Sequence, residues 1–567
     1  MKLEIVAAEG KRKGAARDAA VVFVARPDRK EPARFETVPE TFREAVRRAA
    51  PPDAGNDGSL FTLPLDGDAP ARRLYVFGTG AGEEMPPRRA RGLLRSVVKA
   101  LEKNGERTAL VDFPFTIQRM TAAEAREFLA RNVLVAGYAF PRYRASAREA
   151  SRLSSVALAA GRGVFAATPK ELKAACDEAS VVAAASAFVR DLGNTPSNDM
   201  VPRMFADAVK AEARKRGVKA TVLGKKEIAR ERMGGLLAVN RGAAEEPRFV
   251  VLEHRGGKKG GKPVVLVGKG VTFDSGGISL KPADRMGDMK WDMLGAATVC
   301  GAVLAAAELG LPVNVVALAP LTENMPSGTA YKPGDVVTFR NGKTAEIDNT
   351  DAEGRVILAD ALDYAKEFSP AAVVDFATLT GAALVALGLE ASIVFSDDDA
   401  LVKELVSAGE RTDERLWRLP LWDDYRENLR SDWADFKNTG GRNGGSINGA
   451  IFLKEFVDAK TPWAHVDIAP NAYFEREHAG YPTGATSIGL AMTLRWLRDR
   501  ASRKEARAEG FGDREGALGA PHEDEVHPAS GLAAPSPRGP RRSAVPREHR
   551  QQGPGAPGFR HRGSSDH

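Results

Sequence analysis

The feature that most constrains the fold is the apolar run Pro263–Val267. Glycines follow it directly, and an aspartate and a lysine come next. The run is typical of a buried strand. In open α/β sheets, functional groups gather beyond the carboxyl ends of the strands, so Asp274 and Lys281 are expected at such an edge. Strand and helix patterns then alternate densely from Val264 to Leu497. This alternation predicts a mixed, doubly wound sheet with helices on both faces.

A second acidic segment, Asn349–Arg355, lies about 80 residues downstream. Its two carboxylates, Asp351 and Glu353, are two residues apart. In an extended or turning backbone both project to the same side, where they reach one metal ion or bridge two. Arg355 continues the alternation and places a guanidinium beside them. A solvated turn also shows this spacing, so the segment alone does not decide between the two interpretations.

A third carboxylate, Asp292, precedes the helical pattern Leu294–Leu309. A carboxylate near a helix N-terminus is favoured even without a metal, so a helix cap is an equal alternative for this residue. Four carboxylates in one pocket would repel one another unless cations were present. Two divalent ions carry four positive charges, which balance the four negative charges of these carboxylates. The four candidates are Asp274, Asp292, Asp351 and Glu353.

Histidine usage limits the kind of metal site. Five of the eight histidines lie in the last 46 residues, which leaves His254, His465 and His478 for the folded part. Paired-histidine spacing of the H-E-x-x-H type is absent from the sequence, so a thermolysin-type zinc site is excluded. A metal site here uses oxygen donors, together with an amine at most. Carboxylate-rich sites accept zinc, manganese, magnesium and cobalt, which leaves the metal open.

These motifs resemble the leucyl (cytosol) aminopeptidases, a family of dinuclear metallo-exopeptidases. The resemblance covers about residues 165–500 and rests on five stretches in the family's order. They are RDLGNTPSNDMVP from Arg190, VGKGVTFDSGGISLKP from Val267, MKWDMLGAA from Met289, NTDAEGR from Asn349 and DFKNTGGRNGGSINGAIFLKEF from Asp435.

The resemblance assigns a role to each candidate ligand. It implies that Asp274 and Glu353 bridge two divalent ions, that Asp351 completes one ion, and that Lys269 with Asp292 completes the other. Lysine ligates only as the neutral amine, so Lys269 would need a strongly lowered pKa, which burial and adjacent dications supply. A lysine paired with carboxylates is the alternative interpretation.

The family's chemistry follows from these roles. A water or hydroxide between the two metals becomes a nucleophile at neutral pH. A metal and the Lys281 ammonium would then stabilise the oxyanion that develops on the peptide carbonyl. The resemblance further implies that Arg355 holds a bicarbonate ion as general base. Binding of the substrate's free amino group to the second metal would explain why only N-terminal residues are released.

Substrate binding is also implied by the resemblance. The Leu379 carbonyl would receive the substrate amine, and Met289, Thr378 and Gly381 would line the side-chain pocket. A broad apolar pocket favours leucine and other apolar residues without strict exclusion. After Thr486 the chain continues Ser-Ile-Gly where the family has Gly-Arg-Pro, so the residue preference stays open.

The first 160 residues predict an α/β unit with little chemistry of its own. By position it resembles the family's amino-terminal domain, which shares the macro-domain fold. The expected strands are Leu3–Ala7, Ala20–Ala25, Leu74–Phe77, Ala109–Phe113 and Val156–Ala160, and the expected helices are Arg88–Lys103 and Ala122–Val135. We expect four parts: a macro-like domain (1–165), a linker helix (166–200), a catalytic domain (201–502) and a disordered basic tail (503–567). The Gly256–Lys262 loop is expected to be a hairpin tip.

Composition and charge narrow the setting. The two cysteines, Cys176 and Cys300, lie in apolar helical patterns, which indicates buried thiols in a reducing cytoplasm. The amino terminus lacks a signal-like apolar region, and no window has 18 uninterrupted apolar residues, so neither a secretion signal nor a membrane span is expected. From Pro537 the tail has seven arginines against two acidic residues, a net +5 of the total +7, so the high pI does not indicate a nucleic-acid surface. Polar composition of this kind predicts disorder.

The preferred prediction is therefore a cytoplasmic aminopeptidase that acts on peptides in intracellular turnover and forms a homohexamer, as its relatives do. Nucleic acid is not expected as a partner, although a nonspecific contact of the tail with a polyanion stays open. Two alternatives remain: an architectural DNA-binding protein on the same scaffold, and a dipeptidase limited to Cys-Gly-type substrates.

Overall fold

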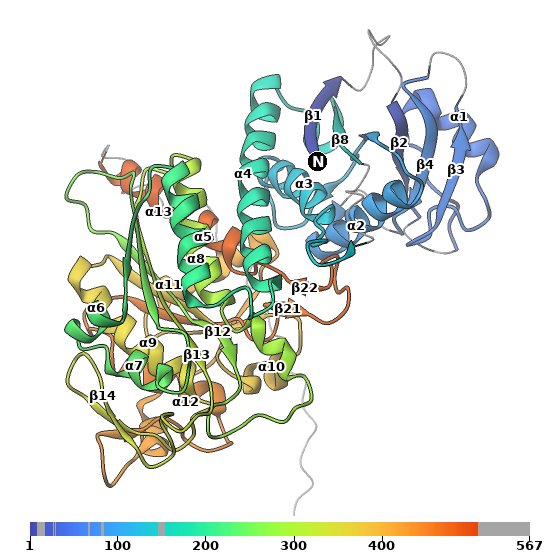
Figure 1. Cartoon of the computed structure of the whole chain (residues 1–567). Coiled ribbons are helices and arrows are strands. Elements are labelled where there is room, and N and C mark those ends of the chain that lie inside the picture. The colour runs from blue at the N-terminus through green and yellow to red at the C-terminus, as the bar shows by residue number, and fades with distance from the viewer. Residues whose placement is uncertain are drawn as a thin grey trace, which may run out of the picture. The chain divides into compact units, whose positions relative to one another are not determined.

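The structure is a computed structural model, and two α/β domains form its main compact unit, residues 1–509 (Figure 1). A second unit, residues 510–567, lies outside the described residues. The predicted class, a smaller N-terminal and a larger C-terminal α/β domain, is confirmed. The residues that the structure describes are 1–7, 17–26, 28, 30–65, 69–80, 84–145 and 153–508.

The N-terminal domain contains a six-stranded sheet in the order β1-β8-β6-β2-β4-β3. All neighbouring strands are parallel except β3 and β4, which are antiparallel. One face of the sheet packs on α2 and α3, and the other on α1. The strands are β1 (Lys2–Ala7), β2 (Arg17–Val24), β3 (Leu60–Pro64), β4 (Ala71–Gly78), β6 (Thr108–Val111) and β8 (Ser155–Ala160). The other elements are α1 (Glu40–Ala49), α2 (Pro87–Lys103), α3 (Ala122–Ala136), η2 (Gly163–Phe165) and the short strands β5 (Glu84–Met85) and β7 (Thr116–Ile117).

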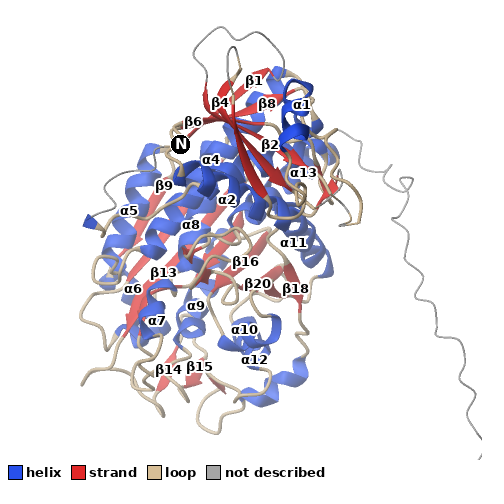
Figure 2. Cartoon of the chain, turned by 90° about the vertical axis from the view of Figure 1, so that its right-hand side faces the viewer, coloured by secondary structure: helices blue, strands red, loops and turns tan. Residues whose placement is uncertain are grey.

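The larger domain contains a nine-stranded mixed sheet, whose strands are visible in Figure 2. Its order is β18-β17-β20-β16-β11-β13-β10-β9, and β12 pairs with β13 outside this path. The strands β20, β16, β11 and β13 are parallel to one another. The bounds are β9 (Lys219–Leu223), β10 (Arg248–Arg255), β11 (Val264–Gly268), β12 (Gly270–Asp274), β13 (Asn314–Asn324), β16 (Ala372–Ala377), β17 (Ser392–Phe395), β18 (Leu416–Arg418) and β20 (Trp463–Asp467).

Side chains alternate between two cores across this sheet: Val264 and Leu266 of β11 enter one core, and Val265 and Val267 enter the other. The first core is closed by α5 (Pro202–Lys215), α8 (Leu294–Glu308), α11 (Asp399–Thr412) and α13 (Leu490–Ala508). The second is closed by α6 (Lys225–Arg230), α7 (Gly234–Asn240), α9 (Glu353–Tyr364), α10 (Gly381–Leu387) and α12 (Gly445–Lys454). The remaining elements are η3 (Met286–Trp291), η4 (Ala365–Phe368), η5 (Asp423–Leu429), β14 (Val336–Thr338), β15 (Thr344–Glu346), β19 (Phe436–Lys437), β21 (Tyr473–Phe474) and β22 (Gly484–Ala485).

A long helix, α4 (Pro169–Asn194), belongs to both domains (Figure 1). It begins with a capping box in which Thr168 and Glu171 satisfy each other's backbone N–H groups. Its first half, including Cys176, packs in the N-terminal core, and its second half, including Val189, packs in the catalytic core. The helix therefore joins the two domains by packing and not as a free linker. The predicted domain bounds themselves stay predictions.

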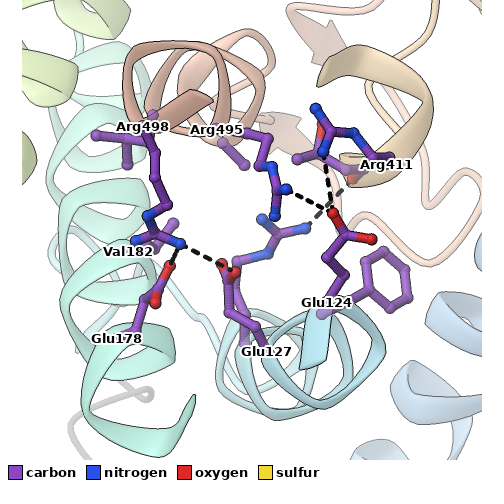
Figure 3. A pocket seen from close by; sticks show the side chains of 12 residues that line it. Glu124, Glu127, Glu178, Val182, Arg411, Arg495 and Arg498 are labelled. Carbon is purple, nitrogen blue, oxygen red and sulfur yellow. Dashed lines mark hydrogen bonds and ion pairs between the residues drawn. The ribbon is translucent and has the colours of Figure 1, made fainter. Parts of the chain in front are cut away.

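Charged helices meet around a small enclosed space between the two domains (Figure 3). Glu124 of α3 pairs with Arg411 of α11 at 3.1 Å and with Arg495 of α13 at 2.6 Å. Nearby, Arg498 of α13 pairs with Glu178 of α4 and lies 3.8 Å from Glu127. The interface thus combines partly buried ion pairs with apolar packing.

Two expectations need correction. The Gly256–Lys262 loop is not a hairpin tip, because β13 lies between β10 and β11 in the sheet. The sequence could not show this, since strand order depends on segments far along the chain. The helix α13 continues to Ala508, into the predicted tail, because the alanines, arginines and glutamate after Ala501 favour helix. The remainder of the predicted tail lies outside the described residues.

The cysteines are as expected: Cys176 and Cys300 are both buried and free. One helical segment, Met286–Glu308, is long and apolar enough to cross a membrane, but 89% of its apolar window is buried inside the protein. Such burial is typical of a core helix.

Candidate functional site

The candidate site forms at the carboxyl ends of parallel strands. Lys269 follows β11, Asp274 is the last residue of β12, and Thr378 follows β16. The strands β11 and β16 pair in parallel, and β12 runs parallel to the end of β13. The sheet therefore brings these residues to one edge although they are far apart in sequence.

Two other segments approach the same edge. Glu353 is the first residue of α9, where the helix N–H groups favour a carboxylate, and Asp351 lies just before it. Asp292 follows η3 and precedes α8, but the cap of α8 is Met293 with no side-chain hydrogen bond. The helix-cap interpretation of Asp292 is therefore wrong. Its Oδ1 instead accepts a hydrogen bond from Thr378 Oγ1 at 2.7 Å.

Two lysines join the four carboxylates into one cluster. Lys269 Nζ lies 2.8 Å from Asp292 Oδ1 and 2.8 Å from Glu353 Oε1. Lys281 Nζ lies 2.8 Å from Asp274 Oδ2 and also pairs with Asp351. Oxygen atoms of Asp274, Asp351 and Glu353 all lie within 4.8 Å of one another. Six of the seven charged site residues predicted from the sequence thus meet in this cluster, and the seventh is Arg355.

Burial governs the protonation of the carboxyl groups. It raises the pKa of Asp274 to about 6, and the Glu353 charge adds to the rise. Burial likewise raises the pKa of Asp292 well above its usual range. For Glu353 burial opposes ionisation, but Lys269 and Lys281 outweigh it and hold its pKa below the usual value. The cluster is therefore short of positive charge.

The lysines respond in the opposite direction. Burial alone would lower the pKa of Lys269, but the charges of Asp292 and Glu353 raise it above its usual value. The pKa of Lys281 is raised for the same reason, with Asp274 as the largest contributor. The lowered pKa predicted for Lys269 requires bound dications, whereas here carboxylates are its nearest charges. As an ammonium, Lys269 cannot ligate a metal.

The donor set fits divalent cations. Four carboxylates face two ammonium groups, which leaves negative charge uncompensated. The buried Oδ2 of Asp292 accepts no hydrogen bond within the described part of the chain. An unsatisfied buried carboxylate oxygen is costly unless a cation or donor reaches it. Oxygen ligands in this number suit manganese, magnesium or zinc.

Glycines leave room for this cluster. Gly276 and Gly277 have φ angles of 86° and 67°, which L-residues with side chains rarely adopt. A Cβ at Gly276 would also lie 2.9 Å from Asp351 Oδ1. A Cβ at Gly354 would lie 2.6–2.7 Å from the end of the Lys269 side chain. Because Gly354 of the NTDAEGR motif has no side chain, the end of the Lys269 side chain can lie directly against it.

Sequence reasoning missed the residues that orient the carboxylates. Asn324, at the end of β13, donates to Asp274 Oδ1 at 2.8 Å and to the Thr350 carbonyl at 3.0 Å. Tyr331 donates to the same carbonyl at 2.8 Å. The position of Asn324 at the end of an apolar strand was a usable signal, because Lys269 and Asp274 occupy similar positions. Tyr331 has no signal in the sequence.

Arg355 lies in the interior of the site. Its Nη1 donates to the Asn438 carbonyl at 2.9 Å, and its buried Nε has no hydrogen-bond partner among the described residues. Burial lowers its pKa to about 10, although the charge of Glu353 opposes this. Carboxylates within the described ranges do not pair directly with this guanidinium, so it keeps donors for a small anion.

Two of the predicted substrate residues, Thr378 and Met289, contact Asp292. The Thr378 carbonyl accepts from Lys269 Nζ at 2.9 Å, and Leu379 follows in the same segment. Gly381 begins α10, and Met289 in η3 accepts the Asp292 backbone N–H at 3.3 Å. Asp292 thus contacts both Met289 and Thr378. The pocket that Met289, Thr378, Leu379 and Gly381 are expected to line stays a prediction.

The segment that departs from the family pattern packs on α4. Ser487 has a φ angle of 62°, and its hydroxyl lies 2.6 Å from the hydroxyl of Ser186. Asn194 accepts the Ala485 N–H at 2.9 Å and the Trp291 indole N–H at 3.3 Å. The change after Thr486 thus affects how this segment is anchored to the helix.

Comparison with known proteins agrees with this geometry. Residues 187–494 match the model of the cytosol aminopeptidase family's catalytic domain, and residues 21–147 match that of its N-terminal domain. The chain belongs to the cytosol aminopeptidase family. The class of activity is accordingly that of a metal-dependent aminopeptidase, a hydrolase that acts on peptides.

Relatives span most of the chain. A probable cytosol aminopeptidase of Geobacter sulfurreducens is 45% identical over 434 residues, which is 76% of this chain and 86% of that protein. One of Syntrophotalea carbinolica is 43% identical over 443 residues, 78% of this chain and 88% of that protein. The solved structure of the bottromycin maturation enzyme BotP is 36% identical with a TM-score of 0.74, and it covers 86% of this chain and 100% of BotP. These relatives do not support the DNA-binding or Cys-Gly dipeptidase alternatives.

Proposed function

We propose that this chain releases N-terminal amino acids from peptides, with leucine and other apolar residues preferred, and that it does so with two divalent ions at the carboxylate cluster. The observation that carries the proposal is the meeting of Lys269, Asp274, Asp292, Asp351 and Glu353 at one sheet edge with excess negative charge. Membership of the aminopeptidase family supports the reaction class.

The proposed ligand roles follow the positions of the side chains. Glu353 and Asp274 each have a carboxylate oxygen within 4.8 Å of the other and of Asp351, and Glu353 also contacts Lys269 at 2.8 Å. They would bridge the two ions, and Asp351 would complete one of them. Lys269 and Asp292, paired at 2.8 Å, would hold the second ion. Binding requires Lys269 to lose its proton, so metal loading releases a proton.

Bound divalent ions would lower the pKa of a water into the neutral range and polarise the scissile carbonyl. The chain's own residues provide the rest. The side chain of Lys281 is 20% exposed, against 4% for Lys269, so Lys281 is the lysine that a substrate carbonyl reaches. Its ammonium would stabilise the developing oxyanion. Arg355, with its unpaired Nε, would hold bicarbonate as proton acceptor.

Substrate would lie along the segment that follows β16. The Leu379 carbonyl would accept from the substrate's amino group, and Met289, Thr378 and Gly381 would line the pocket for its side chain. Leu384 and Val385 of helix α10, which begins at Gly381, are 38% and 89% exposed, so an apolar surface follows this segment in the chain. Such a surface favours leucine over polar residues.

We further propose a cytoplasmic homohexamer that uses manganese or zinc, with magnesium and cobalt as alternatives, and that acts in intracellular peptide turnover. The exposure of Trp417, Trp422 and Trp433, at 65%, 64% and 80%, supports association between copies, which would cover them. A structure of BotP is described as a complex with Mn, which supports manganese.

The test is hydrolysis of leucine p-nitroanilide by metal-stripped protein before and after addition of Mn²⁺ or Zn²⁺. We expect activity only with metal, and none on N-acetyl-leucine p-nitroanilide, which lacks a free amino group. Light scattering of the same sample measures the oligomer. Folded protein that stays inactive with every divalent ion would show that the proposed function is wrong.

A further inference from the structure

A fully buried carboxylate lies beneath the segment that carries the proposed substrate contacts. Asp467 is the last residue of β20, and in the parallel pairing of β16 with β20 it is opposite Ala377. It has no exposed surface. Lysine and arginine side chains of the described residues form no ion pair with it. A buried, unpaired carboxylate is retained only where hydrogen-bond donors satisfy it.

The donors to Asp467 come mostly from one short segment. Its Oδ1 accepts the backbone N–H of Leu379 at 3.1 Å and of Ala469 at 3.1 Å. Its Oδ2 accepts the hydroxyl of Thr380 at 2.7 Å. The same hydroxyl oxygen accepts the N–H of Ala383 at 3.1 Å, which caps the start of α10. One carboxylate thus holds the chain at Leu379 and at Thr380 and fixes where α10 begins.

The other end of the segment contacts the metal-site candidates. The Thr378 carbonyl accepts from Lys269 Nζ at 2.9 Å, and the Thr378 hydroxyl donates to Asp292 Oδ1 at 2.7 Å. Thr378 is therefore held on one side by Lys269 and Asp292. On the other side it continues into Leu379 and Thr380, which bind Asp467. Three consecutive residues, Thr378–Thr380, connect a buried carboxylate in β20 to the cluster beside β11.

We propose that Asp467 is a positioning residue for the aminopeptidase reaction: it fixes the Thr378–Gly381 segment, and through Thr378 it sets the geometry of Lys269 and Asp292. The inference rests on the proposed function for its kinetic consequence, but the positioning itself is a property of the chain. Second-layer contacts of this kind typically change activity or metal affinity about 10–100-fold when removed.

The chain offers a matched control in Asp360 of α9. It is also fully buried, and its carboxylate likewise accepts backbone N–H groups, from Leu236 at 3.0 Å and Arg340 at 2.9 Å. These contacts join α9 to α7 and to the turn after β14, away from the Thr378–Gly381 segment. Asp360→Asn thus reports the general cost of altering a buried, N–H-binding carboxylate.

The experiment compares Asp467→Ala, Asp467→Asn and Asp360→Asn in the full chain. Hydrogen exchange of the metal-free proteins, followed by mass spectrometry, measures peptides covering residues 378–388. We expect faster exchange there in Asp467→Ala, a smaller increase in Asp467→Asn, and none in Asp360→Asn. If Asp467→Ala does not fold, Asp467→Asn decides. Unchanged exchange in the folded Asp467 variants would overturn the proposal.

Kinetics of the Mn²⁺-loaded proteins give the second readout. For Asp467→Asn we expect kcat/KM on leucine p-nitroanilide to fall about 10–100-fold, with a reduced ratio of leucine to alanine p-nitroanilide turnover. A fall no larger than that of Asp360→Asn, with an unchanged ratio, would show a purely structural role. Should wild-type protein itself be inactive, the proposed function fails, whereas the exchange measurement still decides whether Asp467 positions the segment.

Discussion

Lys269 and Lys281 each contact two carboxylates, but their surroundings differ. Lys269 is enclosed by Gly354, Asp292, Glu353 and the Thr378 carbonyl. Lys281 is partly exposed. An enclosed lysine suits the proposed ligation as a neutral amine, because the metal takes the place of its proton, whereas an accessible ammonium suits contact with substrate. The difference in exposure supports the two roles proposed for these lysines, which the sequence assigned by resemblance alone.

The first prediction concerns the carboxylate at the centre of the cluster. Glu353→Gln keeps the side-chain shape but removes the charge that would bridge two cations, a loss of several kcal/mol. We expect kcat/KM on leucine p-nitroanilide to fall by at least roughly a thousandfold while the far-ultraviolet circular dichroism is retained. Metal content after dialysis should fall in parallel.

Asp348→Asn is the control for this substitution. Asp348 is an exposed carboxylate five residues before Glu353, and it accepts the Thr439 hydroxyl at 2.6 Å outside the cluster. Its replacement should leave the metal content unchanged. Near-normal turnover by Glu353→Gln would contradict the site assignment.

The second prediction concerns Gly354 of α9. Alanine in a helix is ordinarily favoured over glycine by about 0.5–1 kcal/mol. Here the added Cβ would lie 2.6–2.7 Å from Lys269 atoms, so the lysine must move away from Asp292 and Glu353. We expect Gly354→Ala to fold but to bind Mn²⁺ at least about tenfold more weakly, as measured by titration calorimetry.

Gly92→Ala in α2 is the matched control, because nothing lies within 4 Å of the added Cβ. It should raise the free energy of unfolding by about 0.5–1 kcal/mol without any effect on Mn²⁺ affinity. Equal Mn²⁺ affinities in the Gly354→Ala and wild-type proteins would show that the close approach to Lys269 is tolerated.

At the scale of elements, the contact between helices α3, α4 and α13 is expected to make the stability of the fold depend on pH (Figure 3). Burial, together with the neighbouring Glu178 charge, raises the pKa of Glu127 to about 7, while Arg131 and Arg498 oppose the rise. The charged groups lining the same space also include Glu124, Arg411 and Arg495. Because the folded pKa exceeds the unfolded value, the folded state binds an extra proton, and stability falls as pH rises through about 7.

The third prediction follows from that sign. Glu127→Gln keeps a hydrogen-bonding side chain beside Glu178 but has no charge to bury. We expect its urea midpoint to exceed that of wild type at pH 8 and the difference to shrink at pH 5.5. Glu40→Gln, at an exposed position in α1, should show no such pH-dependent difference. A wild-type pH profile in Glu127→Gln would contradict the prediction.

At the scale of the whole molecule, the two domains are held together by buried charge as well as by α4. Arg91 of α2 is 5% exposed and lies 2.8 Å from Asp413, which is 7% exposed and follows α11. The guanidinium also stacks on the Tyr481 ring, with its central carbon 4.1 Å from the ring centroid. These contacts join the N-terminal domain to two separate parts of the catalytic domain.

The fourth prediction tests this contact. Arg91→Met leaves Asp413 buried without its nearest partner, which typically costs about 3–5 kcal/mol. We expect Arg91→Met to keep its secondary structure but to have a lower urea midpoint. The double variant Arg91→Met/Asp413→Asn should recover part of the loss, because it removes the buried charge and asparagine tolerates the left-handed backbone at this position, where φ is 58°. Arg48→Met, at an exposed pair with Glu44, serves as control. A loss no larger than in Arg48→Met would show that the pair is not important for stability.

Many strands and helices could be predicted from the sequence because local residue patterns specify them. The apolar runs at Ala20–Ala25 and Leu74–Phe77 correspond to strands β2 and β4, and the pattern at Arg88–Lys103 is a helix. The strand β3 and the helix α1 were not predicted. In β3 every second residue is exposed and the others only partly buried, so its apolar signal is weak. Strand order, by contrast, is a long-range property, and the misplaced hairpin at Gly256–Lys262 shows that adjacency in sequence does not fix it.

The sequence by itself determined the family and the candidate residues for its chemistry, because the acidic and glycine-rich segments and their order are typical of that family. Tertiary structure decided what those groups contact. Only parallel pairing of β11, β16 and β20 brings Lys269, Thr378 and Asp467 to one edge. Likewise, only packing makes Gly354 a spacer for Lys269. Residue types set the possible chemistry locally, whereas burial and distance arise when segments far apart in sequence meet.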